Sequence, residues 1–178
     1  MPAARAMSAI YNFMLRSFYI LLAIALAHTA FAADALPGPH FVGFVQEAND
    51  FEIAAGHLAL RRSGNAVIRA HAQRMIVEHE DSAARLSHSR AEAGITLAPT
   101  PGGREPRHAR ILDHLATLEG PAFDAVYVRS QIDAHAEAVA QVGAYSQNGD
   151  NGGLRRFAQV LLPKLQVHFE QSRRLPAP

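Results

Sequence analysis

Residues 66–93 read AVIRAHAQRMIVEHEDSAARLSHSRAEA, and the spacing of their apolar side chains decides the fold class. Apolar residues recur along this stretch on one helical face, and they are Ile68, Ala72, Met75, Ala83 and Leu86. Asn65 stands directly before the stretch, and asparagine is a residue type that caps helix N-termini. Gly94 follows it and is suited to a helix end. The stretch is therefore predicted to be one long amphipathic helix.

Three further stretches have the same helical spacing, and they cover residues 40–62, 120–147 and 154–175. Short turns join the first helix to the second and the third to the fourth, which predicts two antiparallel hairpins. Residues 95–105, ITLAPTPGGRE, form a longer connection, and Pro106 can start a short helix after it. Two hairpins joined by a long crossover with a short helix predict an all-α, ferritin-like four-helix bundle.

The composition agrees with helices and excludes several kinds of site. Alanine is abundant, tryptophan is absent, and there is no cysteine, so neither disulfides nor thiolate metal ligands can form. The formal net charge is +1; the first 32 residues hold two arginines and no acid, which leaves 15 basic and 16 acidic residues after them. A nearly neutral domain lacks the basic surface that binds nucleic acid, so no nucleic-acid partner is expected.

The N-terminus has the pattern of a secretory signal. Arg5 and Arg16 precede an apolar run at residues 18–27, and Ala30-Phe31-Ala32 offers a small-x-small cleavage motif. The apolar run is shorter than the about 20 residues that span a bilayer. No second stretch of the chain is apolar enough to be a span, so no transmembrane segment is expected beyond the signal.

We expect the signal to cover residues 1–33, with cleavage after Ala32 or Ala33, and the helical domain to cover residues 34–178. The domain would then be periplasmic or secreted. An uncleaved N-terminal membrane anchor is the alternative. Both place the domain outside the cytoplasm.

Four ionisable residues interrupt the apolar faces, one in each long helix: Glu52, His79, His135 and His168. Each lies near the middle of its predicted helix, so all four can meet at one depth in the bundle. Burying a carboxylate or an imidazole without a partner is costly. One carboxylate and three imidazoles are suitable ligands for one divalent transition metal such as zinc, iron, copper or manganese. We therefore predict a buried metal site at these four residues.

Three neighbours are candidates for the surroundings of this site. Met75 lies one turn before His79, and a thioether there would favour copper. Gln131 lies one turn before His135 and can hydrogen-bond to a ligand. Glu78 is a third candidate, although it lies about 100° around the helix from His79 and is expected to point elsewhere.

Other histidines and other chemistries have weaker support. His71 is expected nearer the surface, and His108 and His114 are expected in solvent. The di-iron pattern needs a glutamate three residues before its histidine, but Ile76 and Leu165 occupy those positions. No nucleophile elbow, phosphate loop or HExxH motif occurs, so no catalytic residue is assigned and an enzymatic activity is left open.

Each long predicted helix contains one motif stretch, and the four stretches are FEIAAGHLAL (51–60), AQRMIVEH (72–79), FDAVY (123–127) with His135, and Phe157-Ala158 with Leu162-Pro163 and His168. In this order they resemble the bacterial family called domain of unknown function 4142. The family's pattern has an acidic residue before the second-helix histidine, usually aspartate, where this chain has Glu78. The resemblance implies an exported, ferritin-like helical fold and no established activity. Two functions remain open: a protein with a buried metal centre, or a non-enzymatic envelope interaction or stress module with a metal-free polar network.

Overall fold

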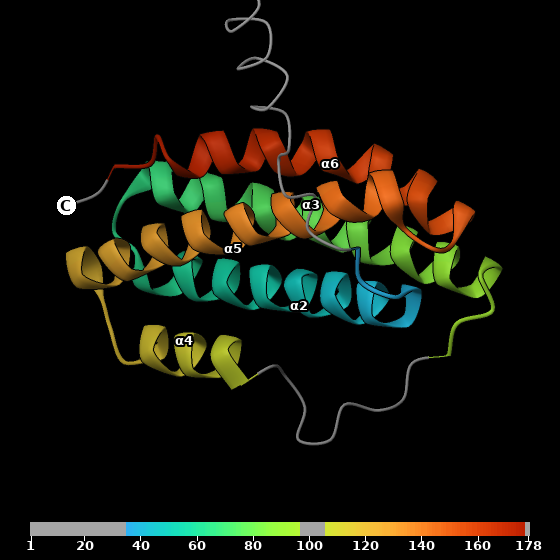
Figure 1. Cartoon of the computed structure of the whole chain (residues 1–178). Coiled ribbons are helices and arrows are strands. Elements are labelled where there is room, and N and C mark those ends of the chain that lie inside the picture. Colours follow the sequence, from blue (N-terminus) through green and yellow to red (C-terminus); the bar gives the residue numbers. More distant parts are fainter. Residues whose placement is uncertain (1–34, 97–105, 177–178) are drawn as a thin grey trace, which may run out of the picture. The chain divides into compact units, whose positions relative to one another are not determined.

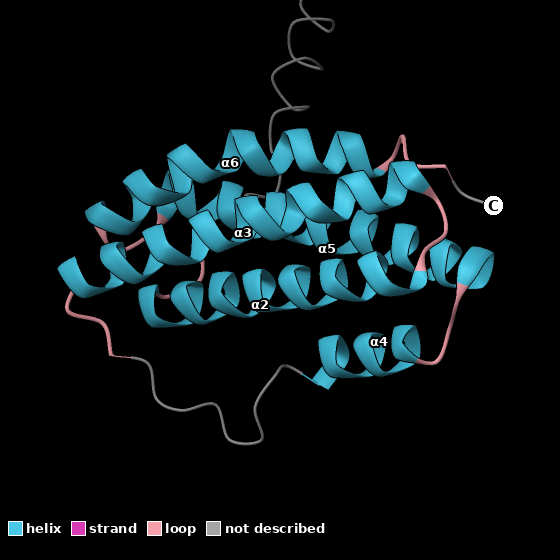
Figure 2. Cartoon of the chain, turned by 180° about the vertical axis from the view of Figure 1, so that it is seen from behind, coloured by secondary structure: helices cyan, strands magenta, loops and turns pink. Residues whose placement is uncertain are grey.

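The computed structural model describes residues 35–96 and 106–176. These residues form five helices, which are α2 (Gly38–Arg62), α3 (Ala66–Glu92), α4 (Pro106–Ala116), α5 (Gly120–Asn148) and α6 (Gly152–Ser172) (Figure 1). No strand occurs within these two described ranges (Figure 2), so the all-α prediction is confirmed. The predicted signal, residues 1–33, lies outside the described residues.

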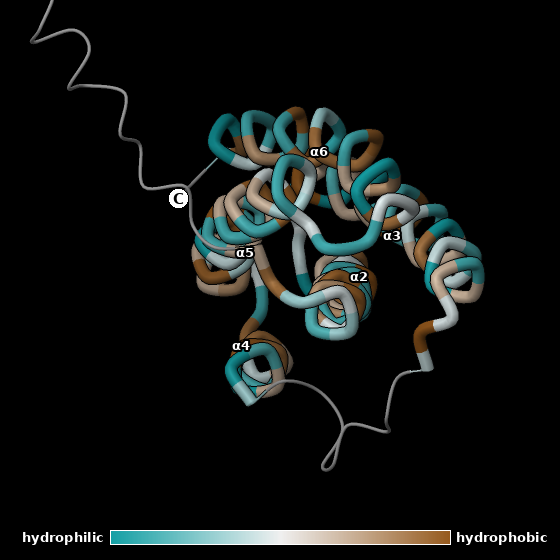
Figure 3. Tube along the Cα trace, turned by 45° about the vertical axis from the view of Figure 1, so that its right-hand side comes forward, coloured by the Kyte–Doolittle hydropathy of each residue, from teal (hydrophilic) through white to brown (hydrophobic). Residues whose placement is uncertain are grey.

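The four long helices pack as two antiparallel pairs. Helix α2 packs along α3, and α5 packs along α6. Figure 1 shows that the two members of each pair run in opposite directions. The pairs meet because α2 also contacts α5 and α3 also contacts α6, while the short α4 packs against α2 and α5. Figure 3 shows that each helix carries both hydrophobic and hydrophilic positions, as amphipathic spacing requires.

Asparagines cap the N-termini of two helices: Asn65, as the sequence predicts, and Asn151, which the sequence analysis does not identify. The Asn65 side chain accepts a hydrogen bond from the backbone N–H of Val67 at 2.9 Å, and so starts α3. Asn151 accepts one from Gly153 at 2.9 Å and starts α6. A side-chain oxygen at this position satisfies a backbone N–H that has no partner inside the helix, which stabilises a helix by about 1 kcal/mol.

A glycine sets the distance between α2 and α3. A Cβ atom at Gly56 would lie 2.7 Å from Cγ1 of Ile76 and 3.1 Å from the backbone oxygen of Ala72. Both distances are shorter than an ordinary van der Waals contact, so only glycine permits this approach. Because Ile76 and Ala72 flank the turn before His79, the close approach also positions that histidine relative to α2.

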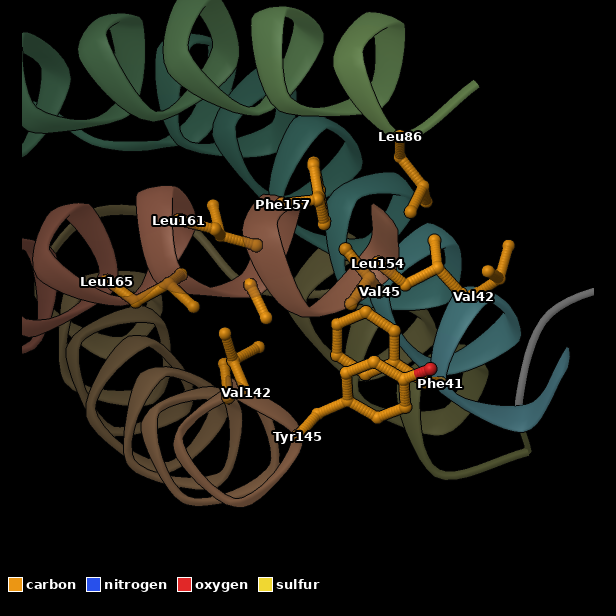
Figure 4. Packing of buried hydrophobic residues seen from close by; sticks show 12 residues of the cluster. Phe41, Val42, Val45, Leu86, Val142, Tyr145, Leu154, Phe157, Leu161 and Leu165 are labelled. Carbon is orange, nitrogen blue, oxygen red and sulfur yellow. The ribbon is translucent and has the colours of Figure 1, made fainter. Parts of the chain in front are cut away.

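Two hydrophobic clusters fill the interior. The first, which we call the Phe41 cluster, joins α2, α3, α5 and α6 near one end, and in it the Phe41 and Tyr145 rings stack at 3.8 Å (Figure 4). The second, the Phe51 cluster, lies towards the other end and includes Phe123 and Tyr127. Along α2, α3 and α5, the buried polar residues Asn49, His79 and His135 fall between members of these two clusters. The polar residues are therefore enclosed by apolar side chains at mid-length.

Candidate metal centre

Three histidines from three helices meet in the interior. His79 of α3, His135 of α5 and His168 of α6 are 4%, 1% and 4% exposed. Their ring centroids are 5.7, 5.5 and 5.4 Å apart in the three pairs. One ring nitrogen from each lies within 4.8 Å of the other two, an arrangement that can hold a metal ion. They meet because each occupies the inward face of its helix at the same depth.

Each imidazole makes one hydrogen bond to a protein oxygen. His79 donates from Nδ1 to Oδ1 of Asn49 at 2.9 Å, and His135 donates from Nδ1 to the backbone oxygen of Gln131 at 2.9 Å. His168 donates from Nε2 to Oε2 of Glu78 at 2.6 Å. Such bonds select the neutral tautomer in which the other ring nitrogen carries a lone pair, and they orient the ring.

The other nitrogen of each ring is buried, and none of the three has a hydrogen-bond partner among residues 35–96 and 106–176. We call these atoms, Nε2 of His79, Nε2 of His135 and Nδ1 of His168, the open nitrogens. Buried polar atoms in folded proteins are normally paired. A metal cation bound among the three rings would take up such lone pairs.

Burial keeps the three imidazoles neutral. It lowers the pKa of His79 well below 6.5, and the neighbouring His135 and His168 lower it further. Burial also lowers the pKa of His135 to about 4, against the opposing effect of its bond to the Gln131 backbone. The pKa of His168 is lowered by burial, although the Glu78 carboxylate opposes the shift. Neutral imidazoles bind metal without first losing a proton.

Glu52 borders the three histidines and is not a member of the group that can hold a metal. Its side chain is 2% exposed, and its Oε1 lies 3.7 Å from Nδ1 of His135. Gln131 donates from Nε2 to Oε2 of Glu52 at 2.6 Å. Burial raises the pKa of Glu52 to about 8, with the Gln131 hydrogen bond and His168 acting in the opposite direction. The structure thus brings three of the four predicted ligands together and places the fourth beside them.

The three predicted neighbours lie in different surroundings. Gln131 is fully buried, and its bonds to the Glu52 side chain and the His135 ring place it against the site. Met75 is fully buried on the turn before His79. Glu78 was expected to point elsewhere, and this is wrong, because it accepts the hydrogen bond from His168. Helix α6 packs against α3, so a side chain beside the inward face of α3 can reach it.

Two histidines that the sequence analysis places near the surface or in solvent, His71 and His108, are buried, so these two expectations are also wrong. His71 is 3% exposed, and its Nε2 donates to Oε1 of Gln131 at 3.2 Å. His108 is 7% exposed and stacks on the Phe51 ring at 4.3 Å, because α4 packs back onto α2. His114 is exposed, as expected. These errors arise where a neighbouring helix covers a position that looks peripheral on its own helix.

Asn49 is the one described residue hydrogen-bonded to the ring of His79, His135 or His168 that the sequence analysis does not identify. It is 2% exposed and accepts the hydrogen bond from His79. Its position three residues before Glu52 places both on one face of α2, so helical spacing could have identified it.

The family comparison agrees with this arrangement of motifs. A family model described as a domain of unknown function, DUF4142, matches residues 25–175. The chain belongs to the DUF4142 family. The resemblance inferred from the four motif stretches is thereby confirmed. No curated protein matches this DUF4142 chain.

Three solved structures share the fold. CopM in a Cu(II)-bound form is 17% identical, with a TM-score of 0.66 over 78% of this chain and 95% of CopM. CopM in a Cu(I)-bound form is 15% identical, with a TM-score of 0.63 over 78% of this chain and 94% of CopM. A DUF305 fragment from Deinococcus radiodurans is 18% identical, with a TM-score of 0.64 over 79% of this chain and 95% of the fragment. At these identities the likeness concerns the helical fold. Among the helices described for the DUF4142 chain, none has the length and apolar character to cross a membrane.

Proposed function

We propose that this DUF4142 chain is an exported, ferritin-like helical-bundle protein that binds one transition-metal ion through His79, His135 and His168. Two observations carry the proposal: each of the three buried histidines has one ring nitrogen within 4.8 Å of the other two, and each ring has one buried nitrogen without a described partner. The hydrogen bonds on the far side of each ring support it, because metal-ligating histidines generally donate their other N–H to an oxygen acceptor. The two antiparallel helix pairs support the ferritin-like description.

Copper is the metal that we favour. Imidazole suits copper and zinc, and among divalent first-row metals copper binds most tightly to nitrogen ligands. Two of the solved neighbours are CopM with Cu(II) and with Cu(I), which is an independent reason to test copper first. Zinc, iron and manganese are the other members of the predicted set. Glu52 supplies a carboxylate beside the ion, and in its ionised form it would offset part of the positive charge.

A metal-free polar network, as in an envelope interaction module, is less consistent with the geometry. It would leave the three open nitrogens buried with their lone pairs unsatisfied. Each unsatisfied buried acceptor costs about 1–3 kcal/mol. A metal ion removes all three costs together, so the metal-binding function explains more of the observed arrangement.

We also propose that residues 1–33 are a secretory signal cleaved near Ala32, which releases residues 34–178 into the periplasm or the medium. The measurement is the intact mass of the protein recovered from the periplasmic fraction. A mass that begins at Ala33 or Asp34 supports cleavage. The uncleaved mass in a membrane fraction would support the N-terminal anchor instead.

The metal proposal is tested by loading the purified protein with equimolar Cu(II), removing free metal, and measuring bound copper by mass spectrometry. Wild-type protein is expected to retain one equivalent. The His135→Ala variant should lose it, whereas His57→Ala, an exposed histidine on α2, should retain it. Stoichiometric copper that survives in both His79→Ala and His135→Ala would refute the site.

A further inference from the structure

A small cavity adjoins the three histidines. Its volume is about 20 Å³, and a water molecule needs roughly 10–15 Å³ of such space, so the cavity accommodates one molecule of that size. The polar part of its wall consists of Asn49, Glu52, His79 and His135. The remaining wall is apolar and comes from α2, α5 and α6; it includes Val45, Val142, Leu161 and Leu165, which are drawn in Figure 4.

Besides the open nitrogens of His79 and His135, two polar wall residues each carry a buried atom with no hydrogen-bond partner among the described residues. Nδ2 of Asn49 is a donor and Oε1 of Glu52, in the ionised carboxylate, is an acceptor, and both are buried without a hydrogen bond to any described residue. The other polar atom of each side chain is engaged, Oδ1 of Asn49 with His79 and Oε2 of Glu52 with Gln131. These bonds hold both side chains in place. A fixed donor and a fixed acceptor at one cavity are complementary to a small molecule that can both accept and donate.

The three imidazoles leave at least one coordination position of the metal to another ligand. Copper and zinc sites with three protein nitrogens commonly take a fourth ligand from solvent. The cavity is next to two of the three histidines and has room for such a ligand. The small volume leaves no room for a larger or chelating ligand, and most of the apolar wall, including Val45, Val142 and Leu161, belongs to the buried Phe41 cluster.

We infer that the metal binds a water or hydroxide ligand in this cavity, between Nδ2 of Asn49 and Oε1 of Glu52. The inference rests on the proposed metal centre. The ligand oxygen coordinates the ion and accepts a hydrogen bond from Asn49, and its O–H donates to Glu52. On this basis Glu52 is not itself a ligand: it orients the solvent ligand, which accounts for its position outside the group of three histidines.

The test is electron paramagnetic resonance of the Cu(II)-loaded protein in ordinary water and in water enriched in oxygen-17. Broadening of the copper lines by oxygen-17 is expected if a solvent oxygen is coordinated. Splitting from three imidazole nitrogens in the same sample reports on the metal centre separately. Three-nitrogen splitting without broadening would overturn the inference and leave the metal centre standing. Absence of the nitrogen splitting would overturn the metal centre.

Two matched substitutions locate the oxygen. Ala138 and Ala158 are both buried in the Phe41 cluster, but only Ala138 lines the cavity. Ala138→Val should fill the cavity and abolish the broadening while the three-nitrogen splitting remains, and Ala158→Val should keep both signals. Ala48→Val, on the α2 wall of the same cavity, provides the same test if Ala138→Val does not fold. Broadening that persists in a folded, copper-loaded cavity-filling variant would contradict the inference.

Discussion

The Nε2 atom of His168 lies 2.6 Å from Oε2 of Glu78, and this hydrogen bond joins α6 to α3 beside the three open nitrogens. His168 is buried, whereas the Glu78 side chain is 36% exposed. The Glu78 carboxylate therefore hydrogen-bonds to a buried histidine of the proposed centre while part of its own side chain reaches solvent. This bond engages Nε2 of His168 and leaves Nδ1 as its open nitrogen.

Replacing Glu78 should weaken metal binding without removing it. Glu78→Ala deletes the acceptor that orients His168, and loss of such a partner typically lowers metal affinity by about 10–100-fold. Glu78→Gln keeps an acceptor oxygen and should lower the affinity less. Copper affinity measured by competition with a chelator checks this, with Glu80→Ala, an exposed acid on the same helix, as the control. Equal affinities in the wild type and Glu78→Ala would contradict the role of the hydrogen bond.

The metal-free protein should be most stable near pH 6.5. His71 and His135 have their pKa lowered to about 4, mainly by burial, from 6.5 in an unfolded chain. Between these values the unfolded chain binds more protons, so stability is lost as the pH falls from 6.5 to 4. The pKa of Glu52 is raised by burial from 4.5 to about 8. Between pH 4.5 and pH 8 the folded state binds more protons at Glu52 than the unfolded chain does, so the stability that Glu52 contributes is lost as the pH rises towards 8.

The measurement is urea unfolding between pH 4 and pH 9 with a chelator present. Each group contributes a slope of about 1 kcal/mol per pH unit inside its own window. Below pH 6.5 the combined slope of the two histidines is larger than the opposite slope of Glu52, so the free energy of unfolding rises with pH. Above pH 6.5 only Glu52, of these three groups, still changes it. Glu52→Gln cannot ionise, so it should remove the decline above pH 6.5 and make the rise in stability between pH 4.5 and pH 6.5 steeper. A decline of unchanged slope in Glu52→Gln would show that another group causes it.

Copper should stabilise the fold, and only through the histidines. A ligand at 100 times its Kd adds about 2.7 kcal/mol to the free energy of unfolding when it binds the folded state alone. For a chain of this size that corresponds to a rise in Tm of roughly 5–10 °C. Thermal unfolding followed by circular dichroism should show this rise in wild-type protein, and a chelator should reverse it. The His135→Ala variant should show no rise, and a rise of the same size there would place the binding elsewhere.

Adding one methyl group at Gly56 should destabilise the protein. The new Cβ would lie 2.7 Å from Cγ1 of Ile76, so α2 and α3 must separate. Overpacking of this kind costs about 1–3 kcal/mol. Gly43 on the same helix is the matched control, since a Cβ there has no described atom within 4 Å. Gly43→Ala should stabilise the protein by about 0.5–1 kcal/mol, as expected for replacing glycine inside a helix. Urea unfolding of both variants gives the comparison, and equal effects at the two positions would argue against close packing at Gly56.

Much of the fold could be predicted because helical spacing is a local property. The predicted helix over residues 66–93 and the observed α3 over Ala66–Glu92 differ by one residue, because Asn65 caps the start and the chain leaves the helix just before Gly94, whose φ of 67° disfavours other residues. The inward positions of His79, His135 and His168 follow from the same periodicity. Contacts between helices could not be predicted in this way, as His71 and His108 illustrate.

By itself the sequence determined where the helices lie and that Glu52, His79, His135 and His168 face inward, since both depend on a repeat of a few residues along one chain. Only the tertiary structure decided which nitrogen of each histidine faces its neighbours. That choice depends on acceptors such as Asn49 and Glu78, which come from other helices. It also depends on interhelical distances that small residues such as Gly56 permit. Hydrogen bonds act over about 3 Å, so partners far apart in sequence are selected only once the helices have packed.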